Sequence, residues 1–542
     1  MTTRVAKWMG AFSAGLWLAA GAAMASGIGP LASTEWLAKN LGRPDLVIID
    51  ASPGRLYAAG HIPGAVNADV FAFGGREVAP AEMQRRIRSW GVSADRRVVI
   101  YDAGGTFLAT SIHFDLAYHG FPPERMAVLD GGLAKWKAMG GSVTTEPTPA
   151  PAPGTFGVSG PREDIRVRLA EFVTATGDPA HHAVVDALEP AQHFGGMKFF
   201  DRAGHVPNAI LAPAADFFRE DRTFKSPGEI RRMLAHLGIP PEKTMHAHCG
   251  GGIAASAPFF AAKWLAGYPA VKLYRESQLE WLRDERGLPF WTYGAPGLVR
   301  ERDWLAGWGN AMVRSFGVSH VSVIDVRTPE AYRNAHLPFS VNVPAATFRA
   351  LRGQPTELAK ALGAAGVNPE HEAVIVSEGG VNADSALAFV LIERLGQKRV
   401  SVLAGSVDDW GFAGHPLVKA EAPDPSKAAP AARPLAYAAS PRHGITAAAD
   451  APEGVAPRLY VAMGKAVPAS VPPGKVVHVP QAGLVKPDGT PKPAMEIWTA
   501  LAKAGVSRDA EVISFADDPG DAAAGYLLLR LMGFPVARVL SP

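Results

Sequence analysis

Short apolar runs that end in aspartate recur along this chain, and each is followed by a His-x-Pro turn. Because the runs are short, continuously apolar and rich in β-branched residues, they predict strands that are buried on both faces of a sheet. Their recurrence at domain-sized intervals indicates tandem copies of one unit. The runs are residues 47–50, 184–186 and 323–325, and the turns lie at His61, His205 and His336.

A second apolar run follows in each copy, after an amphipathic helical pattern and a turn that opens with glycine. A fourth, weaker copy shows only this second half clearly. Strands that alternate with helices predict an α/β fold in which each domain is a parallel sheet flanked by helices. The second runs are residues 97–101, 244–248, 373–376 and 511–515, followed directly by Asp102, Cys249, Ser377 and Ala516.

The repeats, together with the Pro/Ala-rich stretches between them, divide the 542 residues into four domains. The last copy lacks a clear aspartate and His-x-Pro pair, and we expect it to be degenerate. The predicted domains are 26–144, 161–296, 297–419 and 457–542, with linkers at 145–160 and 420–456.

The N-terminus has the pattern of a secretory signal peptide over residues 1–25. Arg4 and Lys7 precede an apolar run at 8–24, and Ala23-Met24-Ala25 offers a small-x-small cleavage site. The alternative is an uncleaved anchor, but the run is shorter than the ~20 residues a spanning helix needs. In a Gram-negative source the mature protein would be periplasmic, with no stable membrane span after cleavage.

Composition narrows the classes of partner. The net charge is only +3, and the basic residues are spread without a Lys/Arg block, so nucleic-acid binding has no support. The chain has one cysteine, Cys249, which excludes an intramolecular disulfide. With one cysteine and no carboxylate–histidine cluster, we expect neither a metal site nor another cofactor.

Cys249 lies at the carboxyl end of a predicted strand, where ligands bind in parallel sheets. A glycine-rich turn follows it and opens into a predicted helix, so backbone N–H groups are expected to face the sulfur and favour the thiolate. We interpret Cys249 as a nucleophile; the alternative is a small buried apolar residue. The predicted binding loop consists of Gly250, Gly251, Gly252, Ile253, Ala254 and Ala255.

The chain resembles the rhodanese (sulfurtransferase) superfamily at several of these motifs. They are the aspartate-ending strand, Gly-His-Ile-Pro-Gly-Ala-Val-Asn at 60–67, the loop after the second strand, and Val-Leu-Asp-Gly-Gly-Leu-Ala-Lys-Trp at 128–136. The resemblance implies tandem rhodanese domains, each with a five-stranded parallel sheet. It also implies a silent first domain with Asp102 and an active second domain in which Cys249 carries sulfur as a persulfide.

The other copies cannot perform this chemistry. Ser377 and Ala516 stand at the cysteine position of the third and fourth domains and cannot form a persulfide, so both domains are predicted to be inactive. The loop after Cys249 also lacks the arginine that cysteine phosphatases use to hold phosphate, which argues against that activity.

The sulfur donor is less well defined. The loop sequence is similar to that of mercaptopyruvate enzymes, but Leu188 and Gln192-His193 stand where that family carries arginines for the substrate carboxylate. Replacement cations are predicted among Lys198, Arg202 and Arg275, each of which has surface charge as its alternative role. A protonated His248 would lower the thiol pKa, while the alternative is a histidine packed within the sheet.

The leading hypothesis is therefore a periplasmic, thiosulfate sulfurtransferase-like enzyme. It would move sulfur from a small donor, nominally thiosulfate, to cyanide or a thiol through a Cys249 persulfide. One alternative is a 3-mercaptopyruvate or thiol-persulfide sulfurtransferase. Another is a sulfur carrier or scaffold without turnover, in which the third and fourth domains dock a protein partner.

Overall fold

The computed structural model describes residues 28–73, 77–309, 313, 319–419, 434–449 and 454–541. The predicted signal peptide at 1–25 and parts of the linker at 420–456 lie outside these residues. The described residues up to Glu163, together with Phe218–Phe224, form one compact unit. The described residues Asp164–Phe217 and those from Lys225 onward form a second unit.

The first unit contains a parallel five-stranded sheet in the order β1-β5-β4-β2-β3. Its core packs apolar side chains of the strands, such as Val99, against the helices that connect them. The strands are β1 (Leu31–Ala32), β2 (Leu46–Asp50), β3 (Val66–Asn67), β4 (Arg97–Tyr101) and β5 (Met126–Leu129). The helices are α1 (Thr34–Asn40), α2 (Gly54–Ala59), α3 (Val70–Phe73), α4 (Pro80–Ser89), α5 (Leu108–Tyr118) and α6 (Gly132–Ala138).

The second sheet has four parallel strands in the order β7-β6-β8-β9, not the five that the family resemblance implies. At the fifth position, the chain makes only a single parallel bridge between Arg166 and Leu273. The strands are β6 (His182–Asp186), β7 (Ile210–Leu211), β8 (Thr244–His248) and β9 (Val271–Leu273). The helices are α7 (Leu169–Gly177), α8 (Pro190–His193), α9 (Pro227–His236), α10 (Ser256–Phe260), which continues as a π-helix (Ala261–Leu265), and α11 (Ser277–Arg283).

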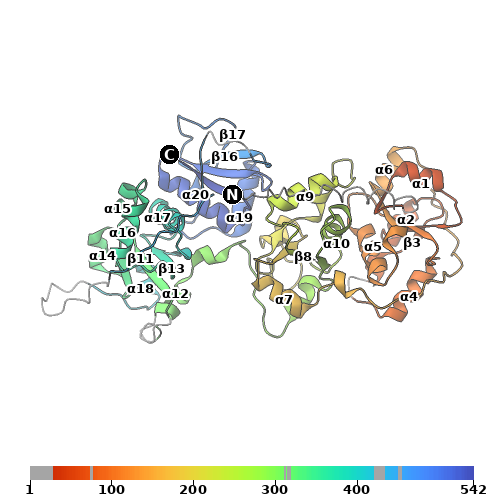
Figure 1. Cartoon of the computed structure of the whole chain (residues 1–542), viewed down its shortest axis with the longest axis horizontal. Coiled ribbons are helices and arrows are strands. Elements are labelled where there is room, and N and C mark those ends of the chain that lie inside the picture. The colour runs from red at the N-terminus through yellow and green to blue at the C-terminus, as the bar shows by residue number, and fades with distance from the viewer. Residues whose placement is uncertain are drawn as a thin grey trace, which may run out of the picture. The chain divides into compact units, whose positions relative to one another are not determined.

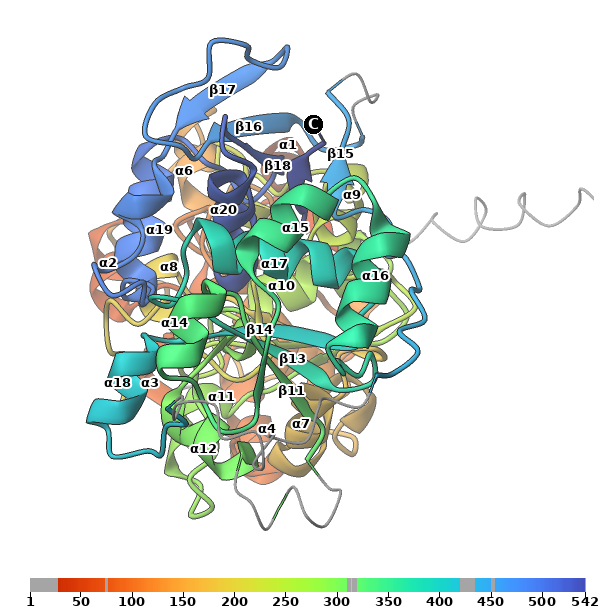
Figure 2. The same ribbon diagram turned by 90° about the vertical axis from the view of Figure 1, so that its left-hand side faces the viewer.

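The third sheet repeats the order of the first, as β10-β14-β13-β11-β12. In Figures 1 and 2, α15, α16 and α17 cover one face of this sheet and α12 and α18 the other. The strands are β10 (Val299–Arg300), β11 (Val321–Asp325), β12 (Ser340–Asn342), β13 (Glu372–Val376) and β14 (Arg399–Leu403). The helices are α12 (Arg302–Gly309), α14 (Pro329–Asn334), α15 (Ala345–Leu351), α16 (Pro355–Ala364), α17 (Ala383–Arg394) and α18 (Val407–Phe412).

The fourth sheet is complete, with five strands in the order β15-β19-β18-β16-β17. Its edge strand β15 lies in the segment expected to be linker. Helix α20 packs on α17, so the third and fourth sheets share one continuous core. The elements are β15 (Thr446–Ala447), β16 (Arg458–Ala462), β17 (Lys475–His478), β18 (Glu511–Phe515), β19 (Ala537–Leu540), α19 (Ala494–Lys503) and α20 (Pro519–Leu531).

Two hairpins at equivalent places in the repeats cover cysteine-position loops. One lies between β7 and α9 and closes with a bridge between Phe218 and Phe224; it packs on Gly105, just after Asp102. The other lies between β17 and α19, at residues 485–491. Its Gly489 accepts the Val381 N–H at 2.8 Å in the loop after Ser377. The third and fourth repeats therefore reproduce a contact made by the first two.

Candidate active site at Cys249

Cys249 directly follows β8, and the loop after it leads into α10. Its side chain is only 2 % exposed. The two histidines of β8 point to one face of the sheet, where the Phe172 ring of α7 lies 5.4 Å from the His248 ring and 6.4 Å from the His246 ring. This alternation follows from the two-residue repeat of a strand. It leaves the sulfur at the end of the strand, within its own loop.

The backbone of the loop turns toward the sulfur. Gly252 donates its N–H to the Cys249 Sγ at 3.1 Å. Burial raises the pKa of the Cys249 thiol above its ordinary value, although hydrogen bonds from the N–H groups of Ala255, Gly252 and Gly251 oppose the increase. We expected the loop to favour the thiolate. Its N–H groups do act in that direction, but desolvation of the charged sulfur has the larger effect, so the net result favours the neutral thiol.

The first turn of α11 holds the backbone of the cysteine loop in place. The Cys249 N–H donates to the Ser277 hydroxyl at 3.1 Å, and the Cys249 carbonyl accepts the Gln278 N–H at 3.1 Å. Leu279 donates its N–H to the Gly250 carbonyl at 3.1 Å. Ser277 itself has a φ of 53°, an uncommon left-handed conformation for a residue other than glycine. These contacts fix the loop before any substrate is present.

Close packing explains two of the glycines. Gly252 has a φ of 81°, and a Cβ there would lie 1.7 Å from the carbonyl oxygen of Arg275. At Gly250 a Cβ would lie 2.5 Å from the Phe199 ring. Phe199 and the neighbouring Phe200 therefore lie over the loop. No local pattern in the sequence indicated these contacts of the two aromatic residues or of Ser277, because they join segments far apart in the chain.

The three predicted substrate cations have different environments. Arg275 is 3 % exposed, and its Nη1 donates to the Gly252 carbonyl at 3.0 Å, so it holds the loop. Arg202 donates to the Leu288 carbonyl at 2.7 Å and lies over the Phe290 ring. Lys198 is exposed and adjoins Phe199 in the chain. Of the three, Lys198 is the one that the described contacts leave most accessible to a dissolved anion.

His248 is fully buried, and neither ring nitrogen has a hydrogen-bond partner among the described residues. Burial lowers the pKa of His248, so the ring is neutral at ordinary pH. A protonated His248 beside the thiol is therefore not what this geometry favours; the packed alternative fits better. Within the described part of the chain, no group of three or more His, Cys, Asp or Glu side chains is arranged to hold a metal ion.

The positions of the missing arginines are also filled by buried side chains. Asp186, at the end of β6, accepts the Leu188 N–H at 3.1 Å and the His193 Nδ1 at 2.9 Å. In the third repeat the equivalent Asp325 is paired instead with the Arg327 guanidinium at 2.7 Å. His193 thus takes the place of an arginine as the partner of the strand-end aspartate.

In the other repeats, the residue at the cysteine position makes different hydrogen bonds to the backbone of its loop. The Asp102 carboxylate accepts the N–H groups of Gly104 at 2.8 Å and Ala109 at 3.0 Å, so a fixed anion fills that loop. The Ser377 hydroxyl donates to the Gly380 carbonyl at 3.0 Å. Ala516 offers no polar side chain. Among the four equivalent positions, Cys249 alone presents a nucleophilic sulfur to a loop of N–H groups.

Comparisons with known proteins agree with this fold. A family model described as a rhodanese-like domain matches residues 33–139 and 309–413, two segments that do not include Cys249. A probable 3-mercaptopyruvate sulfurtransferase of Pseudomonas aeruginosa is 32 % identical over 277 residues, which cover 96 % of that protein and 47 % of this chain. The chain belongs to the rhodanese superfamily of sulfurtransferases, and its class is that of a sulfur-transferring enzyme with small sulfur donors and acceptors.

Other relatives carry different names. A sulfur carrier protein of Thermus thermophilus is 30 % identical over 272 residues, which are 93 % of that protein and 46 % of this chain. A thiosulfate sulfurtransferase of P. aeruginosa is 31 % identical over 252 residues, 91 % of its length and 45 % of this chain. A crystal structure of a 3-mercaptopyruvate sulfotransferase from Escherichia coli matches with 26 % identity and a TM-score of 0.42, covering 98 % of that chain and 46 % of this one.

The chain is about twice as long as these relatives, since each matches just under half of it. No helix within the described residues is long and apolar enough to cross a membrane.

Proposed function

We propose that the protein transfers sulfane sulfur through a persulfide on Cys249. In the first step the Cys249 thiolate attacks the outer sulfur of thiosulfate, the sulfur–sulfur bond of the donor breaks, and sulfite leaves with the bonding electrons. In the second step cyanide or a thiolate attacks the outer sulfur of the persulfide. That step forms thiocyanate or a new persulfide, and it restores the Cys249 thiolate.

One observation carries this proposal: the Gly252 N–H is hydrogen-bonded to the Cys249 Sγ at 3.1 Å in a loop that is held from behind. N–H groups fixed around a sulfur stabilise negative charge both on the thiolate and on the outer sulfur of a persulfide, without reorganising during the reaction. Because burial raises the pKa of the thiol, the sulfur has to lose its proton before it can attack the donor.

The nominal donor is thiosulfate, and Lys198 is the residue we propose to attract it. Lys198 is exposed and lies beside Phe199, whose ring packs on the cysteine loop at Gly250. Arg202 is a second candidate with a weaker case, because its guanidinium already donates to a carbonyl. The relative named thiosulfate sulfurtransferase supports the choice of donor.

Two other functions remain as alternatives. The relative named 3-mercaptopyruvate sulfurtransferase favours an organic donor, but Leu188 and His193 are buried where arginines would bind a carboxylate. A thiol persulfide is a further donor of the same class. The relative named as a sulfur carrier favours a protein that holds the persulfide without rapid turnover. Stable sulfur loading with slow release to every small acceptor would select the carrier.

The sequence pattern of the N-terminus supports a proposal for the cellular compartment in which the protein works. We propose that residues 1–25 direct export and that the mature protein works in the periplasm, where one unpaired thiol is retained for chemistry. In this proposal the third and fourth domains offer a surface for a protein that supplies or receives sulfur. Locating the protein by fractionation of its source cells would test the first part directly.

The decisive experiment is the intact mass of the purified mature protein before and after thiosulfate, beside a Cys249→Ser variant. The expected result is a gain of one sulfur atom that cyanide removes, with no gain in the variant. The same gain in the Cys249→Ser protein would rule out the persulfide at Cys249. A gain with mercaptopyruvate or a thiol persulfide but not thiosulfate would keep Cys249 and replace the donor.

A further inference from the structure

A cavity of about 290 Å³ lies where the second repeat meets the fourth, away from the cysteine loop. Lys243, in the connection before β8, contributes from the second repeat. Arg508, in the turn between α19 and β18, contributes from the fourth. Close approach of two glycines forms part of the wall, since a Cβ on Gly294 would lie 2.7 Å from the Gly533 Cα.

Arg508 is held in this wall with part of its guanidinium unsatisfied. Its Nη1 donates to the Leu211 carbonyl at 2.7 Å, while its Nε is buried and has no hydrogen-bond partner among the described residues. Burial lowers the pKa of Arg508 to about 10, which records the cost of keeping the charge there. A buried donor without a partner is expensive, so an occupant that accepts from Nε would stabilise the site.

The side chains that line the cavity carry an excess of positive charge. Among the described residues that line it, none is acidic. The Lys243 ammonium has no ion pair within the described chain, whereas Arg530 is already paired with Glu393 at 3.1 Å. Asp216 and Asp509 act on Arg508 only at longer range, and neither makes an ion pair with it in the residues described. Two cations, Arg508 and Lys243, are therefore left for an anion.

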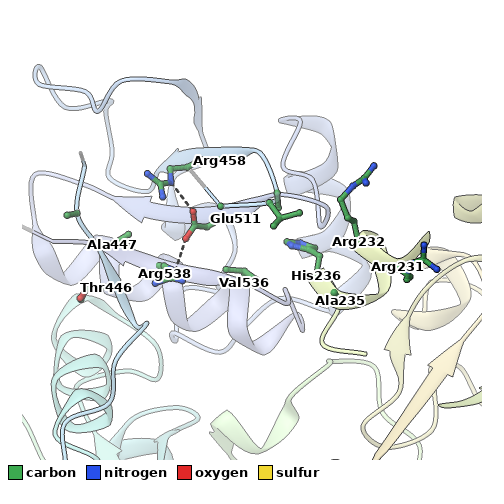
Figure 3. Close-up of a pocket in the computed structure, with 14 residues that line it drawn as sticks. Arg231, Arg232, Ala235, His236, Thr446, Ala447, Arg458, Glu511, Val536 and Arg538 are labelled. Carbon is green, nitrogen blue, oxygen red and sulfur yellow. Dashed lines mark hydrogen bonds and ion pairs between the residues drawn. The ribbon is translucent and has the colours of Figure 1, made fainter. Parts of the chain in front are cut away.

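In a neighbouring cavity two of the lining arginines have an acidic partner, unlike Arg508. This cavity measures about 730 Å³ and lies between α9 and the β15–β19 edge of the fourth sheet (Figure 3). There Glu511 contacts both Arg458, at 2.9 Å, and Arg538, at 2.7 Å, so each of these two guanidinium groups has a carboxylate partner within the protein. Arg232, on α9, also lines this cavity and provides a matched control cation.

We propose that the 290 Å³ cavity binds a small tetrahedral oxyanion with two negative charges, held by the Arg508 guanidinium and the Lys243 ammonium. Guanidinium N–H groups suit the oxygens of sulfate, thiosulfate or phosphate, and ammonium adds a point charge. At about 30 Å³ for each water, the cavity also has room for ordered water around the anion. The site would give the fourth repeat a function although Ala516 removes any persulfide chemistry there.

Calorimetric titration of the full mature chain tests this directly. The Cys249→Ser protein is titrated with sulfate, phosphate or thiosulfate in chloride buffer of constant ionic strength, so that sulfur transfer adds no heat. We expect saturable binding of one anion per chain. Arg508→Gln should weaken it at least about tenfold, Lys243→Met should also weaken it, and Arg232→Gln should leave it unchanged.

The titrations distinguish a site for a sulfur oxyanion, a site for phosphate and the absence of a site. Tighter binding of sulfate or thiosulfate than of phosphate would identify a sulfur oxyanion, and the reverse order would identify phosphate; both support the site. No saturable binding of any of the three, or equal affinity in Arg508→Gln, Lys243→Met and the parent protein, would overturn the proposal. If Arg508→Gln fails to fold, Lys243→Met and Arg508→Lys decide the question. The readout is binding, so it does not depend on the persulfide proposal.

Discussion

The Arg275 guanidinium donates to the carbonyl of Gly252 at 3.0 Å, while the N–H of Gly252 contacts the Cys249 sulfur at 3.1 Å. The same glycine thus receives a hydrogen bond at its carbonyl and gives one to the sulfur. In the first repeat the equivalent position after the strand is Gly131, which has no side chain to make such a contact. Arg275 is therefore a positioning residue for the loop.

Replacing Arg275 by alanine should loosen this loop. The Gly252 carbonyl would lose a buried, charge-assisted partner, which is worth about 1.5–3 kcal/mol. We expect a lower thermal midpoint and sulfur loading of Cys249 slowed by about tenfold, with little change in the donor concentration needed for half-maximal loading. Mass spectrometry of samples quenched at set times, at several thiosulfate concentrations, measures the loading rate and the half-maximal donor concentration. Arg286→Ala, at an exposed position, is the control. A change confined to the half-saturating concentration would indicate substrate binding by Arg275 instead.

A methyl group at Gly252 should be more damaging than one at Gly251. The Gly252 Cβ would lie 1.7 Å from a backbone oxygen at a φ of 81°, whereas at Gly251 the nearest atom, in the Phe200 ring, is 4.0 Å away. We expect Gly252→Ala to abolish sulfur loading and to lower the free energy of unfolding by about 2–4 kcal/mol. Gly251→Ala should retain both. Urea unfolding and intact mass check this, and equal effects of the two variants would contradict it.

The raised pKa of Cys249 predicts how its reactivity changes with pH. Burial favours the neutral thiol, so at any given pH a smaller fraction is thiolate than for a free cysteine. The alkylation rate with iodoacetamide should therefore keep rising with pH beyond the point where a small free thiol levels off. Rates over a pH series, with a cysteine-containing peptide as the reference, make the comparison. A plateau already reached at neutral pH would show that the loop N–H groups outweigh burial.

Much of the fold could be predicted from the sequence, because its signals are local. The runs at 97–101 and 244–248 match β4 and β8, and the parallel sheets flanked by helices are confirmed. The site was harder. Cys249 stands out as the sole cysteine before a glycine loop, but the Ser277 hydroxyl that binds its N–H lies at the start of α11, 28 residues further along the chain. Neither composition nor periodicity reports such contacts between distant segments.

Asp102 should matter for stability but not for sulfur transfer. Its carboxylate accepts loop N–H groups, including those of Gly104 and Ala109, and its side chain is buried. Removing it leaves these donors without partners, so Asp102→Ala should cost about 2–4 kcal/mol of unfolding free energy in the first unit. Sulfur loading per folded molecule should be unchanged. Asp95→Ala, at an exposed position, is the control for urea unfolding; a loss of loading without loss of stability would assign Asp102 a role in the chemistry.

Packing between the second and fourth repeats explains why the chain should not be divided after the second domain. The Phe194 ring, 2 % exposed, stacks on Trp498 with centroids 5.0 Å apart, and the Tyr293 hydroxyl donates to the Lys492 carbonyl at 2.8 Å. Deleting residues 297–542 would expose Phe194, and we expect the shortened protein to unfold at a lower temperature and to aggregate.

Trp498→Ala in the full chain is the finer test of that packing. It removes the same ring contact while keeping every domain, and it should destabilise the second repeat by about 1–3 kcal/mol because Trp498 is only partly buried. Thermal unfolding followed together with sulfur loading distinguishes the roles. If the deletion changes neither the thermal midpoint nor sulfur loading, the third and fourth repeats do not stabilise the cysteine domain. If Trp498→Ala in the full chain lowers the temperature at which sulfur loading is lost, these repeats stabilise the cysteine domain through Phe194.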